Sequence, residues 1–133
     1  MADKIRKSEP EWQTILSTEQ FRVLRSYGTE RAFSGCYWDH HDDGQYICAG
    51  CGQPLFSSSA KFDSGTGWPS FTEPLTDVAI ETSTDRRWFI VSVEVHCASC
   101  DGHLGHVFDD GPTPGGMRYC INSASLDFST RDE

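Results

Sequence analysis

The sequence predicts a single, mainly β domain with two short helices at its N-terminal end. Apolar residues at helical spacing are confined to about residues 9–27. From about residue 32 to residue 129, the chain is rich in turn residues and in short runs that alternate polar with apolar side chains. A length of 133 residues suits one domain, spanning residues 1–133, that buries its own hydrophobic core.

The two helices are indicated by start signals and by apolar spacing. Pro10 suits a first helical turn, and the run from Ser17 to Gln20 has the pattern of a capping box that opens a second helix. Gly28 is expected to end that second helix. The apolar residues expected on the buried sides are Trp12, Ile15, Leu16, Phe21 and Leu24.

Short strands are expected at residues 45–47, 78–82, 88–95 and 117–125. Successive side chains along a strand point to opposite faces, so the last strand places Arg118, Cys120 and Asn122 on one face. A cation two residues from a cysteine favours the thiolate over the thiol. Cys120 is therefore either a half-buried cysteine on an edge strand or a thiol that has to ionise.

The charge balance limits the classes of partner. Eleven basic and twenty acidic side chains give a formal net charge of −9, which disfavours nucleic acid or an anionic membrane surface as a partner. The first residues contain no apolar run, and no segment has the length and apolarity of a membrane span. We therefore expect a cytoplasmic protein, in a reducing compartment that favours metal ligation or redox catalysis over structural disulfides.

Four of the six cysteines form two C-x-x-C units that follow predicted strands; they are Cys48, Cys51, Cys97 and Cys100. Two such turns are the expected halves of a tetrahedral zinc site, which has no open position and would be structural. The 45 residues between the units exceed the roughly 15–20 of a simple zinc ribbon. We expect one Zn²⁺ per chain that joins distant parts of the β domain. Iron is the alternative metal, and a thioredoxin-like motif or a pair of disulfides are the competing interpretations.

The two remaining cysteines, Cys36 and Cys120, are either incidental or a nucleophile with a resolving partner. His103 and His106 lie shortly before Cys120 and are candidates for proton transfer near neutral pH. A second metal site and hydrogen-bonded structural histidines are the other interpretations of this pair.

The loop at residues 64–71 places Trp68 between a glycine and a proline, with Phe71 three residues later. A tryptophan is by default a core residue. On a rigid loop of this composition it can instead form the wall of a small apolar pocket.

Together these motifs resemble the signature of the B-type methionine sulfoxide reductases, the peptide-methionine (R)-S-oxide reductases. In chain order they are Cys48-x-x-Cys51, Gly67-Trp68-Pro69-Ser70-Phe71, Cys97-x-x-Cys100, His103-Leu104-Gly105-His106-Val107-Phe108 and Arg118-Tyr119-Cys120-Ile121-Asn122-Ser123-Ala124-Ser125-Leu126. The match runs from about Ser17 to Phe128. It implies two antiparallel sheets with the N-terminal helices packed against them, and zinc on the side away from catalysis.

The resemblance also implies roles for matching residues. Cys120 is expected to attack the sulfur of methionine-R-sulfoxide, in oxidised proteins or as the free amino acid, leaving a sulfenic acid. Sulfoxide oxygen is a poor leaving group unless it is protonated, so an acid must stand opposite the thiolate. The expected polar network around that oxygen consists of His103, His106, Asp110 (or its neighbour Asp109) and Asn122. Arg118 is expected to favour the thiolate, and Trp68 and Phe71 are expected to bind the substrate side chain.

Many members of that family carry a resolving cysteine at the position that is Thr66 here. Cys36 is then the remaining candidate to attack the sulfenic acid and form a Cys36–Cys120 disulfide, which thioredoxin would reduce. The protein is expected to act as a monomer in the repair of oxidised proteins. Two other functions fit the cysteine pattern: a zinc-ribbon-like binding module in which both spare thiols are idle, and a thiol peroxidase or redox sensor that uses both.

Overall fold

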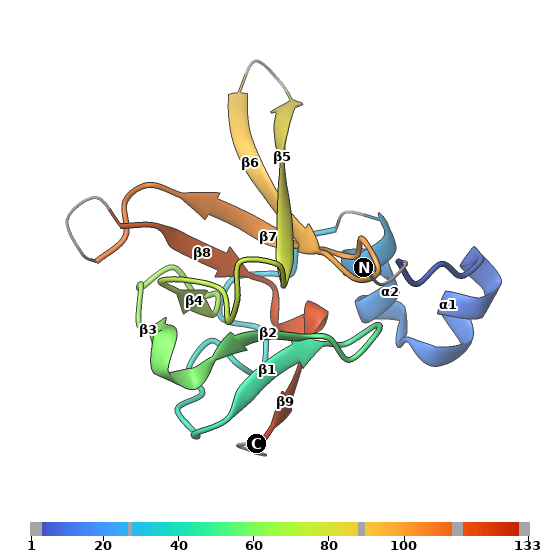
Figure 1. Ribbon diagram of the computed structural model, residues 1–133, viewed down its shortest axis with the longest axis horizontal. Helices are drawn as coiled ribbons and strands as arrows, with labels where there is room; N and C mark the ends of the chain where they lie inside the picture. The colour runs from blue at the N-terminus through green and yellow to red at the C-terminus, as the bar shows by residue number, and fades with distance from the viewer. Residues whose placement is uncertain (1–3, 27, 88–89, 113–115, 131–133) are drawn as a thin grey trace.

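A computed structural model of the chain describes residues 4–26, 28–87, 90–112 and 116–130. Within these residues the chain forms two short helices and two antiparallel sheets (Figure 1), which confirms the mainly β fold. The elements are α1 (Glu9–Ile15), α2 (Thr18–Ser26), β1 (Gln45–Cys48), β2 (Pro54–Ser57), the 3₁₀ turn η1 (Ser58–Ala60), β3 (Lys61–Phe62), β4 (Ser70–Phe71), β5 (Ile80–Arg87), β6 (Ile90–Cys97), β7 (His103–Phe108), β8 (Arg118–Ile121), the 3₁₀ turn η2 (Ser123–Ser125) and β9 (Leu126–Ser129).

The start of α1 is fixed by a capping box that the sequence reading overlooked. The Ser8 hydroxyl accepts the Glu11 N–H at 3.3 Å, and the Glu11 carboxylate accepts the Ser8 N–H at 2.8 Å. Trp12 is buried, as predicted, but Ile15 is 55% exposed, so its assignment to the buried stripe is wrong. The helix ends at Ile15, and the extended Leu16 that follows turns into the core instead.

The capping box predicted for α2 is confirmed. The Ser17 hydroxyl accepts the Gln20 N–H at 3.1 Å, and the Gln20 side chain accepts the Ser17 N–H at 2.8 Å. Leu24 is buried as expected, together with Val23. The helix ends two residues before Gly28, and α2 contacts β7 and η2. No helix of the described residues has the length and apolar character needed to cross a membrane.

The two sheets differ in size. One has three strands in the order β2-β1-β9, and the other has six in the order β3-β4-β8-β7-β6-β5. In Figure 1, β5 and β6 form a long hairpin that extends away from the smaller sheet and the helices. Side chains from both sheets and both helices form one core; its largest fully buried members include Trp12, Tyr46, Phe56, Phe71 and Leu104.

Strand boundaries shift from those expected. The strand expected at 78–82 begins at Ile80, and the strand expected at 88–95 is β6; residues 88 and 89 lie outside the described part of the chain. The stretch at 117–125 forms β8 and then the turn η2, so Asn122 lies between the strand and the turn rather than within the strand.

The register of the larger sheet aligns a row of polar residues across its strands. Ser70 of β4 lies opposite Cys120 of β8, which lies opposite His106 of β7. His106 in turn lies opposite Glu94 of β6, which lies opposite Ser83 of β5. Directly opposed residues of antiparallel strands share a face of the sheet. Topology therefore gathers on one face residues that lie far apart in sequence.

Candidate active site and metal centre

A cavity of about 340 Å³ lies beside the half-buried Cys120. This volume falls within the size range of small-molecule sites. The cavity is lined by Thr29, Thr66, Trp68, Gly105, His106, Phe108, Arg118, Cys120 and Asn122. The three residues that alternation along β8 predicts to share a face thus line one cavity, together with Trp68 and His106.

Two cavity residues are held by hydrogen bonds to the same backbone segment. The indole N–H of Trp68 donates to the carbonyl oxygen of Glu30 at 3.0 Å. The Asn122 amide oxygen accepts the Glu30 N–H at 2.9 Å, and its amide nitrogen donates to the Leu104 carbonyl oxygen at 3.0 Å. With both ends of the buried amide satisfied, Asn122 has a fixed orientation at the cavity wall.

Two glycines allow the backbone to approach the site closely. Gly67 has φ +92°, in the left-handed region that favours glycine, immediately before Trp68. A Cβ on Gly105 would collide with the carbonyl oxygen of Cys120 on the adjacent strand. A larger residue at either position would displace the cavity wall.

Three hydroxyl groups gather near the thiol, and one of them, that of Thr66, belongs to a residue that lines the cavity. Thr66 Oγ1 lies 3.6 Å from Cys120 Sγ, and the buried Ser70 hydroxyl lies 4.0 Å from the same sulfur. Ser64 Oγ joins them, at 2.8 Å from Thr66 Oγ1 and 2.7 Å from Ser70 Oγ. Sequence reasoning missed this set, because only the pairing of β4 with β8 brings the loop to the thiol.

The guanidinium of Arg118 is held at the cavity by Asp110 and Phe108. Two hydrogen bonds of 2.8 and 3.2 Å join it to the Asp110 carboxylate, which lowers the pKa of Asp110 and raises that of Arg118. Nearby Cys120 also raises the pKa of Arg118. The guanidinium lies 4.4 Å from the centre of the Phe108 ring. Asp110 rather than Asp109 is therefore the acidic residue linked to the site, although it is exposed and does not line the cavity.

The two histidines of the H-x-x-H motif lie together but are not equivalent. Their ring centres are 5.5 Å apart, with the ring planes at 70°. His106 lines the cavity, whereas His103 is 3% exposed and lies behind it, with Nδ1 2.8 Å from the Glu94 carboxylate. Of the two histidines expected around the sulfoxide oxygen, His106 thus lies at the cavity wall and His103 lies behind it.

Phe71, which is expected to bind the substrate side chain, does not line this cavity. Phe71 is fully buried and stacks on Phe56, with ring centres 4.3 Å apart and planes at 14°. It follows Ser70 on β4, so alternation directs its side chain away from Cys120 and into the core.

The structure does not bring Cys36 to Cys120. Cys36 is exposed and lines a separate hollow with Glu30 and Ser123. Although the residue is exposed, partial desolvation of its thiol raises the pKa of Cys36, against the effect of hydrogen bonds from its own backbone and Tyr37. A disulfide between Cys36 and Cys120 therefore requires movement from this arrangement.

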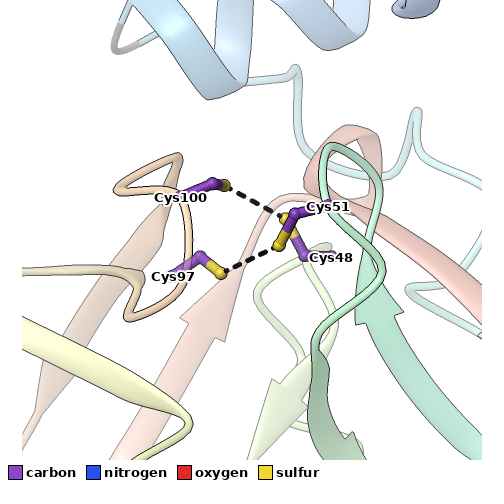
Figure 2. Close-up of side chains that lie close together, drawn as sticks. All are labelled: Cys48, Cys51, Cys97 and Cys100. Carbon is purple, nitrogen blue, oxygen red and sulfur yellow. Dashed lines mark hydrogen bonds between the residues drawn. The ribbon is translucent and has the colours of Figure 1, made fainter. Parts of the chain in front are cut away.

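The two C-x-x-C units meet at the ends of two hairpins (Figure 2). Cys48 and Cys100 sulfurs are 3.7 Å apart, Cys51 and Cys97 sulfurs 3.6 Å, and all four lie within 4.8 Å of one another. A tetrahedron of sulfurs about 2.3 Å from a central Zn²⁺ has edges of about 3.8 Å. The geometry and the thiolate donors thus fit a four-coordinate metal ion between the β1–β2 and β6–β7 turns, and none of these cysteines lines the cavity at Cys120.

A cysteine in a cavity lined by an arginine, a histidine and an amide is the arrangement of an enzyme that works through a reactive thiol. Residues 16–130 match the SelR domain family, and the chain belongs to that family. It is 60% identical to the peptide methionine sulfoxide reductase MsrB of Thiobacillus denitrificans, over 95% of this chain and 96% of that protein. The protein of the same name from Synechococcus sp. is 56% identical, over 97% of this chain and 95% of that protein. The one from Methanosarcina barkeri is 52% identical, over 100% of this chain and 94% of that protein.

Proposed function

We propose that the protein reduces methionine-R-sulfoxide in oxidised proteins to methionine, with Cys120 as the nucleophile. The observation that carries the proposal is the position of Cys120 in a cavity of about 340 Å³, between Arg118, His106 and Asn122. The shared name of the closely similar relatives gives the substrate class.

In the first step the Cys120 thiolate attacks the sulfoxide sulfur, and the sulfoxide oxygen takes up one proton. Methionine sulfur is reduced by two electrons, and Cys120 is oxidised by two electrons to the sulfenic acid. The cation of Arg118 is placed to stabilise the thiolate, and its ion pair with Asp110 holds it in place. His106, opposite Cys120 in the sheet, is placed to supply the proton.

The apolar part of the cavity binds the rest of the side chain. Trp68, whose ring is fixed by its hydrogen bond to Glu30, forms the wall against which the sulfoxide methyl group packs. The buried amide of Asn122 orients the sulfoxide group beside Cys120. A rigid apolar wall and a fixed polar group in one cavity allow the site to distinguish one sulfoxide epimer from the other.

In the second step the Cys36 thiol attacks the sulfenic acid, forming a Cys36–Cys120 disulfide and releasing water. Thioredoxin then reduces this disulfide, which regenerates both thiols. Because the two cysteines line different cavities, the segment that carries Cys36 has to move before this step.

We further propose that the metal is one structural Zn²⁺ per chain, on the basis of four cysteine ligands at tetrahedral spacing. The bound ion joins two turns and takes no part in the reaction. The need for free thiols at Cys36 and Cys120 favours a reducing compartment such as the cytoplasm. Residues of a single chain line the cavity at Cys120, which favours action as a monomer.

The test is turnover of the separated R and S epimers of an N-blocked methionine sulfoxide, with dithiothreitol as reductant. We expect the wild type to reduce the R epimer alone. Cys120→Ser should abolish turnover while the zinc content and the unfolding temperature stay unchanged. Cys36→Ser is the matched control and should retain activity with dithiothreitol, because a small thiol can reduce the sulfenic acid directly.

Reduction of neither epimer by the wild type, or full activity of Cys120→Ser, would refute the proposal. Consumption of hydrogen peroxide in preference to sulfoxide would instead identify a thiol peroxidase.

A further inference from the structure

Glu94 is a buried carboxylate that the proposed reaction does not use. Its residue is 6% exposed, in the middle of β6. One oxygen lies 2.8 Å from His103 Nδ1, and the other accepts the Ser83 hydroxyl at 2.9 Å and lies 3.1 Å from His96 Nδ1. Burial raises the pKa of Glu94, but hydrogen bonds from His103, His96 and Ser83 outweigh it and lower the pKa to about 2. The buried group is therefore a carboxylate at neutral pH.

The register places this carboxylate beside the reaction centre. Glu94 lies opposite His106, and His106 lies opposite Cys120. Glu94 on β6 and Cys120 on β8 thus lie on the two strands that flank β7, and the cavity-lining His106 of β7 lies between them.

A bulge brings His103 into the same group. Val95 pairs with Gly105, but the next residue of β6 pairs with His103, so Leu104 is an extra residue on β7. Without the bulge, His103 and His106 would point to opposite faces, because they are an odd number of positions apart. Bulges commonly re-aim a side chain beside an active site. Here the bulge accounts for the approach of the His103 ring to Glu94 and His106.

The carboxylate determines which nitrogen of His103 carries a proton. A carboxylate can only accept hydrogen bonds, so Nδ1 of His103 must be the donor at 2.8 Å. The His103 carbonyl oxygen accepts the Ser125 hydroxyl at 2.9 Å, which fixes the backbone of the same residue. The ring so held packs edge-to-face against His106. Carboxylates that orient a functional histidine in this way act without touching the reacting atoms.

We propose that Glu94 is a positioning residue for sulfoxide reduction: it fixes the tautomer and orientation of His103, and through His103 the orientation of His106 above Cys120. This role rests on the proposed reductase function. It predicts that removing the charge slows the chemical step and leaves substrate binding intact, because Glu94 does not line the cavity.

The test compares Glu94→Gln with Glu81→Gln in the full-length, zinc-loaded protein. Glu81 undergoes the same chemical change, but it is exposed and its carboxylate contacts His96 and Lys4. For Glu94→Gln we expect kcat for the R epimer to fall by roughly 10- to 100-fold, the range typical when a histidine loses its orienting partner. KM should stay within about twofold of wild type, and Glu81→Gln should match the wild type in both constants.

A second readout does not depend on activity. In the nitrogen NMR spectrum of labelled histidine, wild-type His103 should be the Nδ1–H tautomer, and Glu94→Gln should show a mixture of tautomers or the Nε2–H form. Wild-type kcat in Glu94→Gln would overturn the inference. So would an activity loss that only tracks loss of folded protein while the His103 tautomer is retained. Failure of the wild type to reduce either epimer would refute the reductase function instead, and the tautomer measurement would still test the contact.

Discussion

Removal of the metal is expected to lower the stability of the whole domain, because the four cysteines join segments far apart in the chain. Cys51 and Cys97, whose sulfurs are 3.6 Å apart, are separated by 46 positions. Closing a loop of that size costs about 4 kcal/mol of chain entropy in the unfolded state, on the scale used for covalent cross-links. A bound ion that removes this freedom stabilises the folded domain by a similar amount, and its loss should lower the unfolding temperature by roughly 15 °C.

The assay is thermal and urea unfolding of the reduced protein before and after metal is removed with a strong chelator, with metal content measured in parallel. Cys48→Ser should reproduce the unfolding temperature of the metal-free wild type and bind less than one ion per chain. Cys36→Ser is the matched control and should retain both metal and stability, since Cys36 lies outside the cluster. Equal unfolding temperatures with and without metal, within about 2 °C, would refute the reasoning.

Two further predictions concern the thiols and the buried carboxylate. Thr66 Oγ1 lies 3.6 Å from Cys120 Sγ, so Thr66→Cys should place a resolving thiol beside the nucleophile. In the Cys36→Ser background this substitution should restore thioredoxin-dependent turnover, and mass spectrometry should find the new disulfide. Absence of any recovery would contradict the prediction. The pKa of the Glu94 carboxyl is lowered from an ordinary 4.5 to about 2. This shift corresponds to about 3 kcal/mol of folding stability. The stabilisation is fully present above pH 4.5 and is lost as the pH falls through about 2. Urea unfolding of Glu94→Gln should therefore show a shallower loss of stability over that acid range than the wild type, and an equal slope would show that other carboxyls dominate.

The parts of the fold that the sequence predicts well are those that local chemistry decides. Ser17 and Gln20 cap α2 through reciprocal hydrogen bonds between residues three positions apart. A stretch of four residues is therefore enough to predict where the helix begins. The two C-x-x-C turns likewise carry their ligand geometry within each unit. By contrast, Ile15 has suitable spacing for the buried stripe, but the chain leaves the helix at that residue and the core receives Leu16 instead.

The parts of the site that the sequence leaves open depend on pairing between distant strands. Alternation along β8 correctly groups Arg118 with Cys120, because both lie on one strand. The position of His103 behind the cavity depends on a single extra residue in the pairing of β6 with β7, which no local pattern marks. The core position of Phe71 depends on the register of β4 against β8, which sets Ser70 opposite Cys120 and Phe71 opposite Tyr119. The motif therefore identifies the residues, and only the register separates those that line the cavity from those that lie behind it.

The segment that carries Cys36 also holds the cavity wall, and this links the two halves of the proposed catalytic cycle. Glu30 bonds to Asn122 and to Trp68 through its backbone, and further along the segment the Tyr37 N–H donates to the Ser123 hydroxyl at 3.1 Å. In the proposed second step, movement of Cys36 toward Cys120 is expected to break the last of these bonds and to strain the first two. The cavity wall would then loosen as the disulfide forms. Methionine release and formation of the proposed disulfide should accordingly be coupled, since the same displacement would open the substrate cavity and bring Cys36 toward Cys120.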